Sequence, residues 1–462
     1  MRVITFIAAL LLVTPVTGQL NKQLYDSHNK YLEKSVVPRR FKQEDVAALV
    51  GKLGPAFRVR QVGRSAEGRA ISLISYGNGP VNVLMWSQMH GDETTATRAI
   101  LDIFRFLQAD DSFNNLRTKI NSFITWHFIP MLNPDGAARF TRRNHDGIDI
   151  NRDALRLQTP EGRILKRVRD SLKAGWGFNL HDQGRGTSVN GKPATISLLA
   201  PPFNQASGVN ETRGDAMQLT KYLHDQITAF IPGQIGIYPD DFEPRAFGDN
   251  MQKWGTRTIL IESGGFGDDY EKQEIRRLNF VLLVTAAEAI ADSAYENVPV
   301  DSYHEIPKNA DDRMMELIVY NLNYEGLRRD IGIDRREIDS EDFRKYYAKG
   351  FISDIGDLST AHAYKTFDAS DYIVKRGKVY EPVLESIGQL EALDTQKLLG
   401  EGFTDFIVKD FDPFNSAFPY QVHSKVAMGA QGVQMGGNPS LIFERSGVVE
   451  FALINGVVIA LK

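Results

Sequence analysis

Residues 81–93 read Val-Asn-Val-Leu-Met-Trp-Ser-Gln-Met-His-Gly-Asp-Glu, an apolar run followed by a polar turn. The run over 81–88 predicts a buried strand, and the residues after it predict the start of a helix. At such a turn His90 and Glu93 can direct both side chains toward one point, as the first two ligands of a metal ion require. The pair alone is weak evidence, because the chain has 9 histidines and 58 acidic residues, and this spacing arises readily by chance.

Two other apolar runs end in residues that could complete such a site. The run 175–180 is followed by His181, and the run 256–261 is followed by Glu262. In an open α/β sheet, ligands bind beyond the carboxyl ends of the strands, where these residues fall. Two histidines, one glutamate and an open position describe a catalytic zinc site, because structural zinc sites are closed by four protein ligands. A further glutamate can act as general base on the bound water, so this set predicts a hydrolase.

The part of the chain from residue 19 to residue 295 alternates short apolar runs with longer amphipathic stretches. This alternation predicts an α/β fold in which a mixed, mostly parallel sheet has helices on both faces. We expect strands over 70–76, 81–88, 122–130, 175–180, 195–200 and 256–261, and helices over 93–106, 161–173, 212–230 and 270–291.

Several motifs follow one another in this region. They are His90-x-x-Glu93, Asn-Pro-Asp-Gly at 133–136, Asp-Ile-Asn-Arg-Asp at 149–153, His181 and Glu262, preceded by Val-Gly-Arg-Ser-Ala-Glu-Gly-Arg at 62–69. In this order and at these separations the motifs resemble those of the zinc carboxypeptidases of the carboxypeptidase A type. The resemblance covers roughly residues 58–291. It implies the fold of that family, in which helices flank an eight-stranded, mixed and mostly parallel sheet.

The resemblance also implies the residues of the catalytic centre. One zinc ion per chain would be held by His90, Glu93 and His181. Glu262 would be the base that activates the zinc-bound water and then passes its proton to the leaving amine. Arg142 occupies the place of an arginine that polarises the scissile carbonyl, a task suited to a fixed cation, and its neighbour Arg143 is the competing candidate.

Substrate-binding residues follow from the same resemblance. Asn151 and Arg152 match the pair that binds the free terminal carboxylate of a peptide, because a guanidinium can grip a carboxylate with two hydrogen bonds. The alternative is a structural ion pair of Arg152 with Asp149 or Asp153. The substrate is therefore expected to be a peptide or peptide-like molecule with a free C-terminal carboxylate.

A substrate-capping tyrosine and a specificity pocket are harder to place. Tyr238 is the best candidate for the tyrosine, although Phe242 and Phe247 compete with it. Either Phe247 or Asp249 could face the side-chain pocket. A preference for apolar or aromatic residues and a preference for basic residues both stay open.

The remaining sequence indicates where the protein acts. Residues 1–18 have a positive charge, a short apolar run and small residues before a cut, which predicts a signal peptide and a secreted or periplasmic enzyme. No later run approaches the about 20 apolar residues of a membrane span. A net charge of −4 and the absence of cysteine give no basis for nucleic-acid binding or disulfides.

We expect four parts along the chain: the signal peptide 1–18, the catalytic domain 19–295, a linker or helical segment 296–349, helical near 312–323, and a β-rich accessory domain 350–462. The accessory domain would stabilise the enzyme or position its substrate. The leading hypothesis is a zinc metallocarboxypeptidase. Its rivals are an amidase, deacylase or cell-wall peptide hydrolase on the same scaffold and, less favoured because the full zinc set and Glu262 are present, an inactive binding protein.

Overall fold

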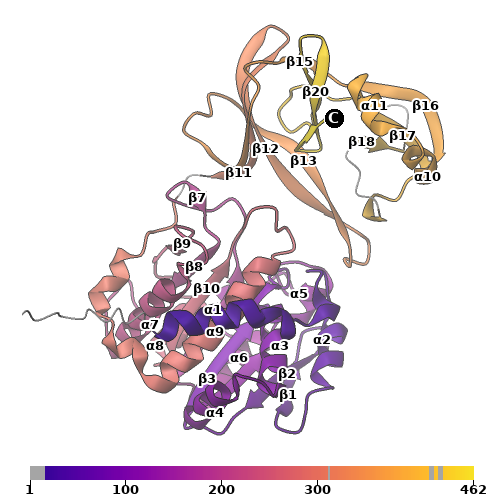
Figure 1. Ribbon diagram of the computed structural model, residues 1–462. Helices are drawn as coiled ribbons and strands as arrows, with labels where there is room; N and C mark the ends of the chain where they lie inside the picture. The colour runs from indigo at the N-terminus through magenta and orange to yellow at the C-terminus, as the bar shows by residue number, and fades with distance from the viewer. Residues whose placement is uncertain (1–15, 311–312, 416–420, 425–429, 462) are drawn as a thin grey trace, which may run out of the picture. The chain divides into compact units, whose positions relative to one another are not determined.

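The computed structural model describes residues 16–310, 313–415, 421–424 and 430–461 (Figure 1). The chain forms two compact units. The first contains residues up to 183 together with 195–308, and the second contains residues 184–194 together with the part from 309 onward. The expected signal peptide lies outside the described residues, except that helix α1 (Val16–Ser27) begins at its last residues.

The first unit is built on an eight-stranded sheet in the order β1-β2-β4-β3-β5-β10-β8-β9. Its strands are β1 (Arg58–Arg64), β2 (Ala70–Tyr76), β3 (Val81–Ser87), β4 (Ile124–Ile129), β5 (Trp176–Asp182), β8 (Ile196–Leu199), β9 (Ile235–Ile237) and β10 (Arg257–Ser263). The pairs β3–β4, β3–β5, β5–β10 and β8–β9 are parallel, and the other three are antiparallel. The predicted mixed, mostly parallel sheet is confirmed.

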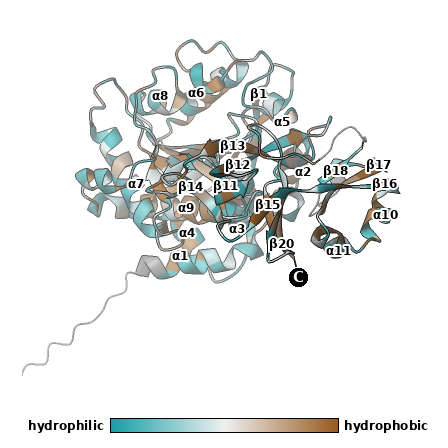
Figure 2. Cartoon of the chain, turned by 90° about the horizontal axis from the view of Figure 1, so that it is seen from above, coloured by the Kyte–Doolittle hydropathy of each residue, from teal (hydrophilic) through white to brown (hydrophobic). Residues whose placement is uncertain are grey.

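Helices cover both faces of this sheet. The α-helices after α1 are α2 (Gln43–Val50), α3 (Thr95–Gln108), α4 (Asn114–Phe123), α5 (Pro134–Ala138), α6 (Pro160–Leu172), α7 (Glu211–Ile227), α8 (Phe247–Lys253) and α9 (Gln273–Asp292). Short 3-10 helices span His28–Lys30, Lys34–Val36, Ile150–Arg152, Ala294–Asn297 and Val300–Glu305. Helices α6 and α7 carry hydrophilic and apolar residues together (Figure 2), as helices that bury one face do. Among the described residues, no helix is both long and apolar enough to span a bilayer.

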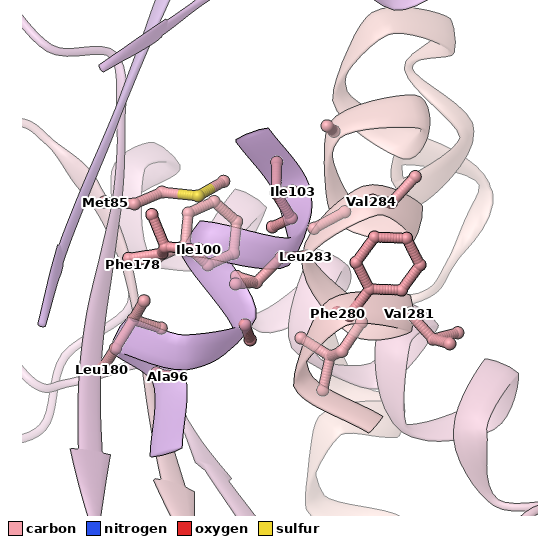
Figure 3. Packing of buried hydrophobic residues seen from close by; sticks show 14 of the residues in the cluster. Met85, Ala96, Ile100, Ile103, Phe178, Leu180, Phe280, Val281, Leu283 and Val284 are labelled. Carbon is pink, nitrogen blue, oxygen red and sulfur yellow. The ribbon is translucent and has the colours of Figure 1, made fainter. Parts of the chain in front are cut away.

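Strand β3 shows why the sheet is buried on both sides. Because side chains alternate along a strand, Val83 and Met85 lie on one face and Leu84 and Trp86 on the other. The first pair joins a large apolar cluster with residues of α3 and α9 (Figure 3). The second pair joins a separate cluster with residues of α6 and α8. An uninterrupted apolar run is therefore what a strand covered by helices on both faces requires.

Sequence patterns located most elements of the first unit. Each of the six expected strands and each of the four expected helices corresponds to an element of the structure, with ends shifted by a few residues. The edge strands β1 and β9 were not expected. Most of β1 is exposed, and β9 has only three residues.

The second unit is mainly β, as predicted for the end of the chain. Its larger sheet has the order β13-β12-β11-β15-β19-β20-β21, with β14 beside β11, and a three-stranded sheet contains β16, β17 and β18. The strands are β11 (Met314–Tyr324), β12 (Leu327–Asp339), β13 (Tyr346–Gly356), β14 (His362–Asp368), β15 (Ile373–Arg376), β16 (Lys378–Ser386), β17 (Phe403–Asp410), β18 (Gln421–His423), β19 (Ser440–Arg445), β20 (Val448–Ile454) and β21 (Val457–Ala460). Two short helices, α10 (Ile387–Glu391) and α11 (Thr395–Gly400), and a 3-10 helix, Pro413–Asn415, accompany them.

The predicted helical stretch near 312–323 is wrong. This segment is strand β11, which pairs with β12 across a turn at Glu325 and Gly326, both of which have positive φ angles. A two-residue turn of this kind matches the twist of an antiparallel hairpin, so the pairing with β12 outweighs the weak helical pattern. The second unit accordingly begins well before residue 350, where we expected it.

A short hairpin from the middle of the catalytic sequence belongs to the second unit. Its strands are β6 (Ser188–Val189) and β7 (Lys192–Pro193), inserted between β5 and β8. Arg185 forms a two-pronged ion pair with Glu316 of β11, at 2.6 and 3.0 Å, and its carbonyl accepts a hydrogen bond from Tyr364. The chain therefore passes between the two units three times.

A buried ion pair fastens the N-terminal segment to the first unit. The guanidinium of Arg276 on α9 donates to both oxygens of Asp102 on α3, at 2.7 and 2.6 Å, and neither side chain is exposed. Asp102 also binds the ring of His28 at 2.9 Å and the backbone N–H of Glu33 at 2.7 Å. One carboxylate thus joins α3, α9 and the chain before α2.

We predict that Asp102→Asn lowers the free energy of unfolding of the first unit by about 3–5 kcal/mol, because Arg276 is left buried without a counter-charge. Urea unfolding followed by tryptophan fluorescence measures this unit alone, since all 4 tryptophans lie in it. Arg105 lies on the same helix as Asp102, and Arg105→Met, which breaks its exposed pair with Glu33, is the control and should cost less than about 1 kcal/mol. Equal losses in the two variants would contradict the prediction.

Candidate metal centre

The candidate ligands lie where two parallel strands end. After β3, Gln88 adopts a positive φ of 45°, and the chain turns through His90 and Glu93 before α3 begins at Thr95. The backbone N–H of Glu93 donates to the carbonyl of His90 at 3.2 Å, which closes this turn. His181 is the sixth residue of β5, the strand beside β3.

The structure brings these three side chains together. One ligand atom from each of His90, Glu93 and His181 lies within 4.8 Å of the others. The Nδ1 atoms of His90 and His181 are 2.8 and 2.6 Å from the two carboxylate oxygens of Glu93 and 3.1 Å from each other. All three side chains are almost entirely shielded from solvent.

The arrangement of these atoms fits a cation. His90 Nε2 is 3.1 Å from a carboxylate oxygen of Asp149, so this nitrogen carries the proton and Nδ1 presents its lone pair to the centre. Burial lowers the pKa of His181, which favours the neutral imidazole that metals bind. Two imidazole nitrogens and a carboxylate, without cysteine, are the donor set of a catalytic zinc site.

Glu262 lies beside these ligands on the next strand. It is paired in register with His181 across the parallel strands β10 and β5, so both side chains project from the same face. Burial raises the pKa of Glu262 well above its usual value, and repulsion from Glu93 and Asp182 adds to this effect. A raised pKa makes this carboxylate a stronger proton acceptor than that of an ordinary glutamate.

Of the two candidate arginines, Arg142 reaches the ligands. Its Nε and Nη2 atoms donate to Asp149 at 3.1 and 2.9 Å, and its Nη1 atom lies 3.1 Å from Nδ1 of His90. Arg143 instead donates to the carbonyl of Gly147. Although burial alone would raise the pKa of Asp149, its bonds to His90 and Arg142 hold that pKa below its usual range.

Asn151 and Arg152 lie in the 3-10 turn that follows Asp149. The side chain of Asn151 accepts a hydrogen bond from the backbone N–H of Phe247 at 2.9 Å. Arg152 is partly exposed, and its Nε atom lies 3.3 Å from a carboxylate oxygen of Glu243. Its ion-pair partner is thus neither of the two aspartates that we considered in the sequence.

The three candidates for a capping aromatic residue differ in burial. Tyr238 directly follows β9 and is half-buried, and its pKa is raised by burial and by repulsion from Glu262. Phe242 is also half-buried, whereas Phe247 is fully buried between α6 and α8 and has no freedom to close over a substrate. Burial raises the pKa of Asp249, also on α8, to about 7.

Residues 46–188 match the family model of the zinc carboxypeptidases. The resemblance to the zinc carboxypeptidases is confirmed. The matched segment contains the three candidate zinc ligands together with Arg142, Asn151 and Arg152, and it ends before Glu262. It also ends within the hairpin that belongs to the second unit.

Solved structures of carboxypeptidases are similar to part of the chain. A metallo-carboxypeptidase from Burkholderia cenocepacia is 17% identical, with a TM-score of 0.45 over 55% of this chain and 70% of that one. A metallo-carboxypeptidase from Pseudomonas aeruginosa, bound to (2-guanidinoethylmercapto)succinic acid, is 18% identical, with a TM-score of 0.45 over 54% and 69%. Carboxypeptidase A from Helicoverpa armigera is 16% identical, with a TM-score of 0.44 over 60% and 80%. No curated protein sequence matched the chain.

Two neighbours of the centre were missed in the sequence. Asp149 was considered only as a partner of Arg152, although its place two residues before Asn151 in one motif puts it near the ligands. Lys272 is buried, and its ammonium donates to the carbonyls of Ser263 and Gln183 at 2.7 and 3.2 Å, where β10 and β5 end. No local pattern could reveal Lys272, because its position depends on how α9 packs.

We predict that His181→Ala lowers the zinc content of the purified protein and abolishes hydrolysis, because two remaining ligands hold the ion weakly. Metal analysis by mass spectrometry measures the first effect independently of activity. His224→Ala, on α7 and with its ring bonded to Asp225, is the control and should retain zinc. Full zinc occupancy in the His181 variant would remove this residue from the site.

Proposed function

We propose that this protein is a zinc metallocarboxypeptidase that hydrolyses the C-terminal peptide bond of peptides. The observation that carries the proposal is the convergence of His90, Glu93 and His181, with Glu262 beside them on the adjacent strand. The match to the zinc carboxypeptidase family over the segment that holds the ligands supports it, and it does not favour an amidase or deacylase.

Each residue of the centre has a distinct task in such a reaction. When bound, the zinc ion supplies a Lewis acid that lowers the pKa of water and polarises a carbonyl oxygen. The carboxylate of Glu262 accepts the proton of the attacking water and later donates it to the leaving amine. Asp149 keeps the proton on Nε2 of His90, so that Nδ1 stays a metal ligand.

Arg142 is the residue that stabilises the developing oxyanion. Its guanidinium is held at the edge of the ligand cluster by Asp149 and is partly exposed, so a substrate carbonyl can reach it. A cation fixed where negative charge develops lowers the barrier without having to reorganise during the reaction.

Asn151 and Arg152 bind the terminal carboxylate of the substrate in this proposal. Arg152 is partly exposed and uses only some of its five N–H donors for Glu243 and the carbonyl of Asn151. Tyr238 is the proposed cap over the bound residue, since it is half-buried and close enough to Glu262 for the two groups to influence each other.

The cellular location and the second unit belong to the same proposal. The charge and apolar pattern of residues 1–18 support export of the enzyme to a secreted or periplasmic location. The second unit would stabilise the catalytic unit or help to position peptides.

We predict that Glu262→Gln retains zinc and binds substrate but loses turnover by several orders of magnitude, because an amide cannot accept the proton of water. Rates are measured on a blocked dipeptide with a free C-terminus, and zinc is quantified in the same samples. Glu296→Gln, a change of the same kind on the surface, is the control. A rate within about tenfold of the parent would exclude Glu262 as the base.

We also predict that the enzyme distinguishes a free C-terminal acid from its amide through Arg152. Arg152→Ala should lower kcat/KM for the acid by at least about thirtyfold and nearly remove the difference between acid and amide, because a charge-assisted pair is lost. Matched acid and amide peptides are assayed with both proteins. Arg143→Ala is the control, since Arg143 binds only Gly147 in the described structure. Equal cleavage of acid and amide by the parent would contradict the carboxypeptidase proposal.

A further inference from the structure

The loop between β9 and α8 places a carboxylate against Arg152. Nε of Arg152 lies 3.3 Å from Oε2 of Glu243, and about a third of each side chain is exposed. Glu243 carries the same charge as a peptide carboxylate and lies against one nitrogen of the guanidinium that such a carboxylate would bind.

The position of Glu243 is fixed by several bonds. Its backbone N–H donates to Asp249 at 3.0 Å, and its carbonyl accepts from Ala246 at 2.9 Å. Its carboxylate accepts a two-pronged bond from Arg245, at 2.9 and 2.7 Å. These bonds hold the carboxylate in place without any contribution from Arg152.

The loop is also bound to the segment that carries Arg152. The backbone N–H of Phe247 donates to the side chain of Asn151 at 2.9 Å, and the backbone N–H of Ala154 donates to the carbonyl of Arg245 at 3.0 Å. The separation between Glu243 and Arg152 is therefore set by contacts on both sides of the pair. The hydrogen bonds from Arg245 to the carboxylate of Glu243 lower the pKa of Glu243 to about 2. This carboxylate is therefore charged at neutral pH.

We propose that Glu243 is a specificity-determining residue that competes with the C-terminal carboxylate of the substrate for Arg152. This inference rests on the proposed function, because it takes Arg152 to be the carboxylate-binding residue. A substrate carboxylate shares the guanidinium with Glu243, which weakens the binding of free acids and has no effect on amides. Arg245 limits this penalty, since it neutralises much of the charge of Glu243.

The test is the substitution Glu243→Gln in the zinc-loaded, full-length enzyme. KM for the free-acid peptide should fall about two- to fivefold, the range expected for a partly exposed ion pair, while kcat and all constants for the amide stay unchanged. Glu243→Ala should act in the same direction, because it also removes the charge and leaves the backbone bonds of residue 243 in place. Glu67→Gln is the matched control, since Glu67 is a partly exposed carboxylate bound by Arg139.

A binding measurement and a double variant complete the test. Calorimetry with the intact free-acid peptide in a Glu262→Gln background should show the same gain in affinity on Glu243→Gln. In an Arg152→Ala background the effect should vanish, because the contested partner is gone.

The possible failures are distinct. A parent enzyme that discriminates acid from amide but shows an unchanged or higher KM after Glu243→Gln would overturn the competition alone. A parent that does not distinguish acid from amide would overturn both this inference and the proposed function.

Discussion

The parallel pairing of β5 with β10 is the constraint on which the candidate centre depends. With His181 opposite Glu262, both side chains must project from the same face, and a shift of either strand by one residue would turn one of them to the opposite face. The register is held by apolar residues on both faces of the sheet, which pack against two separate layers of helices. The hydrophobic core thus determines how far the proposed base lies from the proposed metal.

Two of the buried carboxylates around this edge have a basic partner. Asp149 is neutralised by Arg142, and Asp182 lies 3.3 Å from the ammonium of Lys272. Among the described residues, the partners of Glu93 are two imidazoles and, at 3.5 Å, Arg142, so in the proposed function a divalent cation would add the positive charge that this part of the site lacks. Glu93 and Glu262 are thus the carboxylates at this edge that the proposed metal and the proposed base chemistry use, whereas Asp149 and Asp182 are held by basic side chains.

The sequence was most informative where one local pattern determines structure. The run over 81–88 became β3 because a strand buried on both faces must be apolar throughout, and His90 and Glu93 could be placed because they follow it directly. Strand β12 escaped notice because it is largely polar and half-exposed, so no apolar run marks it, although its partners β11 and β13 are its neighbours in the sequence. The partner of Arg152 could not be predicted for a different reason, since Glu243 lies 91 residues away in an irregular loop and reaches Arg152 only through folding.

The hairpin of residues 184–194 makes the second unit more than an extension added at the end of the chain. A protein shortened at residue 308 would retain Arg185 but lose Glu316 and Tyr364, so a partly buried guanidinium four residues after His181 would lose two of its partners. Conversely, a cut near residue 309 would separate the rest of the second unit from the hairpin that belongs to it. The two units therefore have to be expressed, exchanged or lost together. A recombination event that moved the catalytic segment alone would also move the hairpin of residues 184–194, which belongs to the second unit.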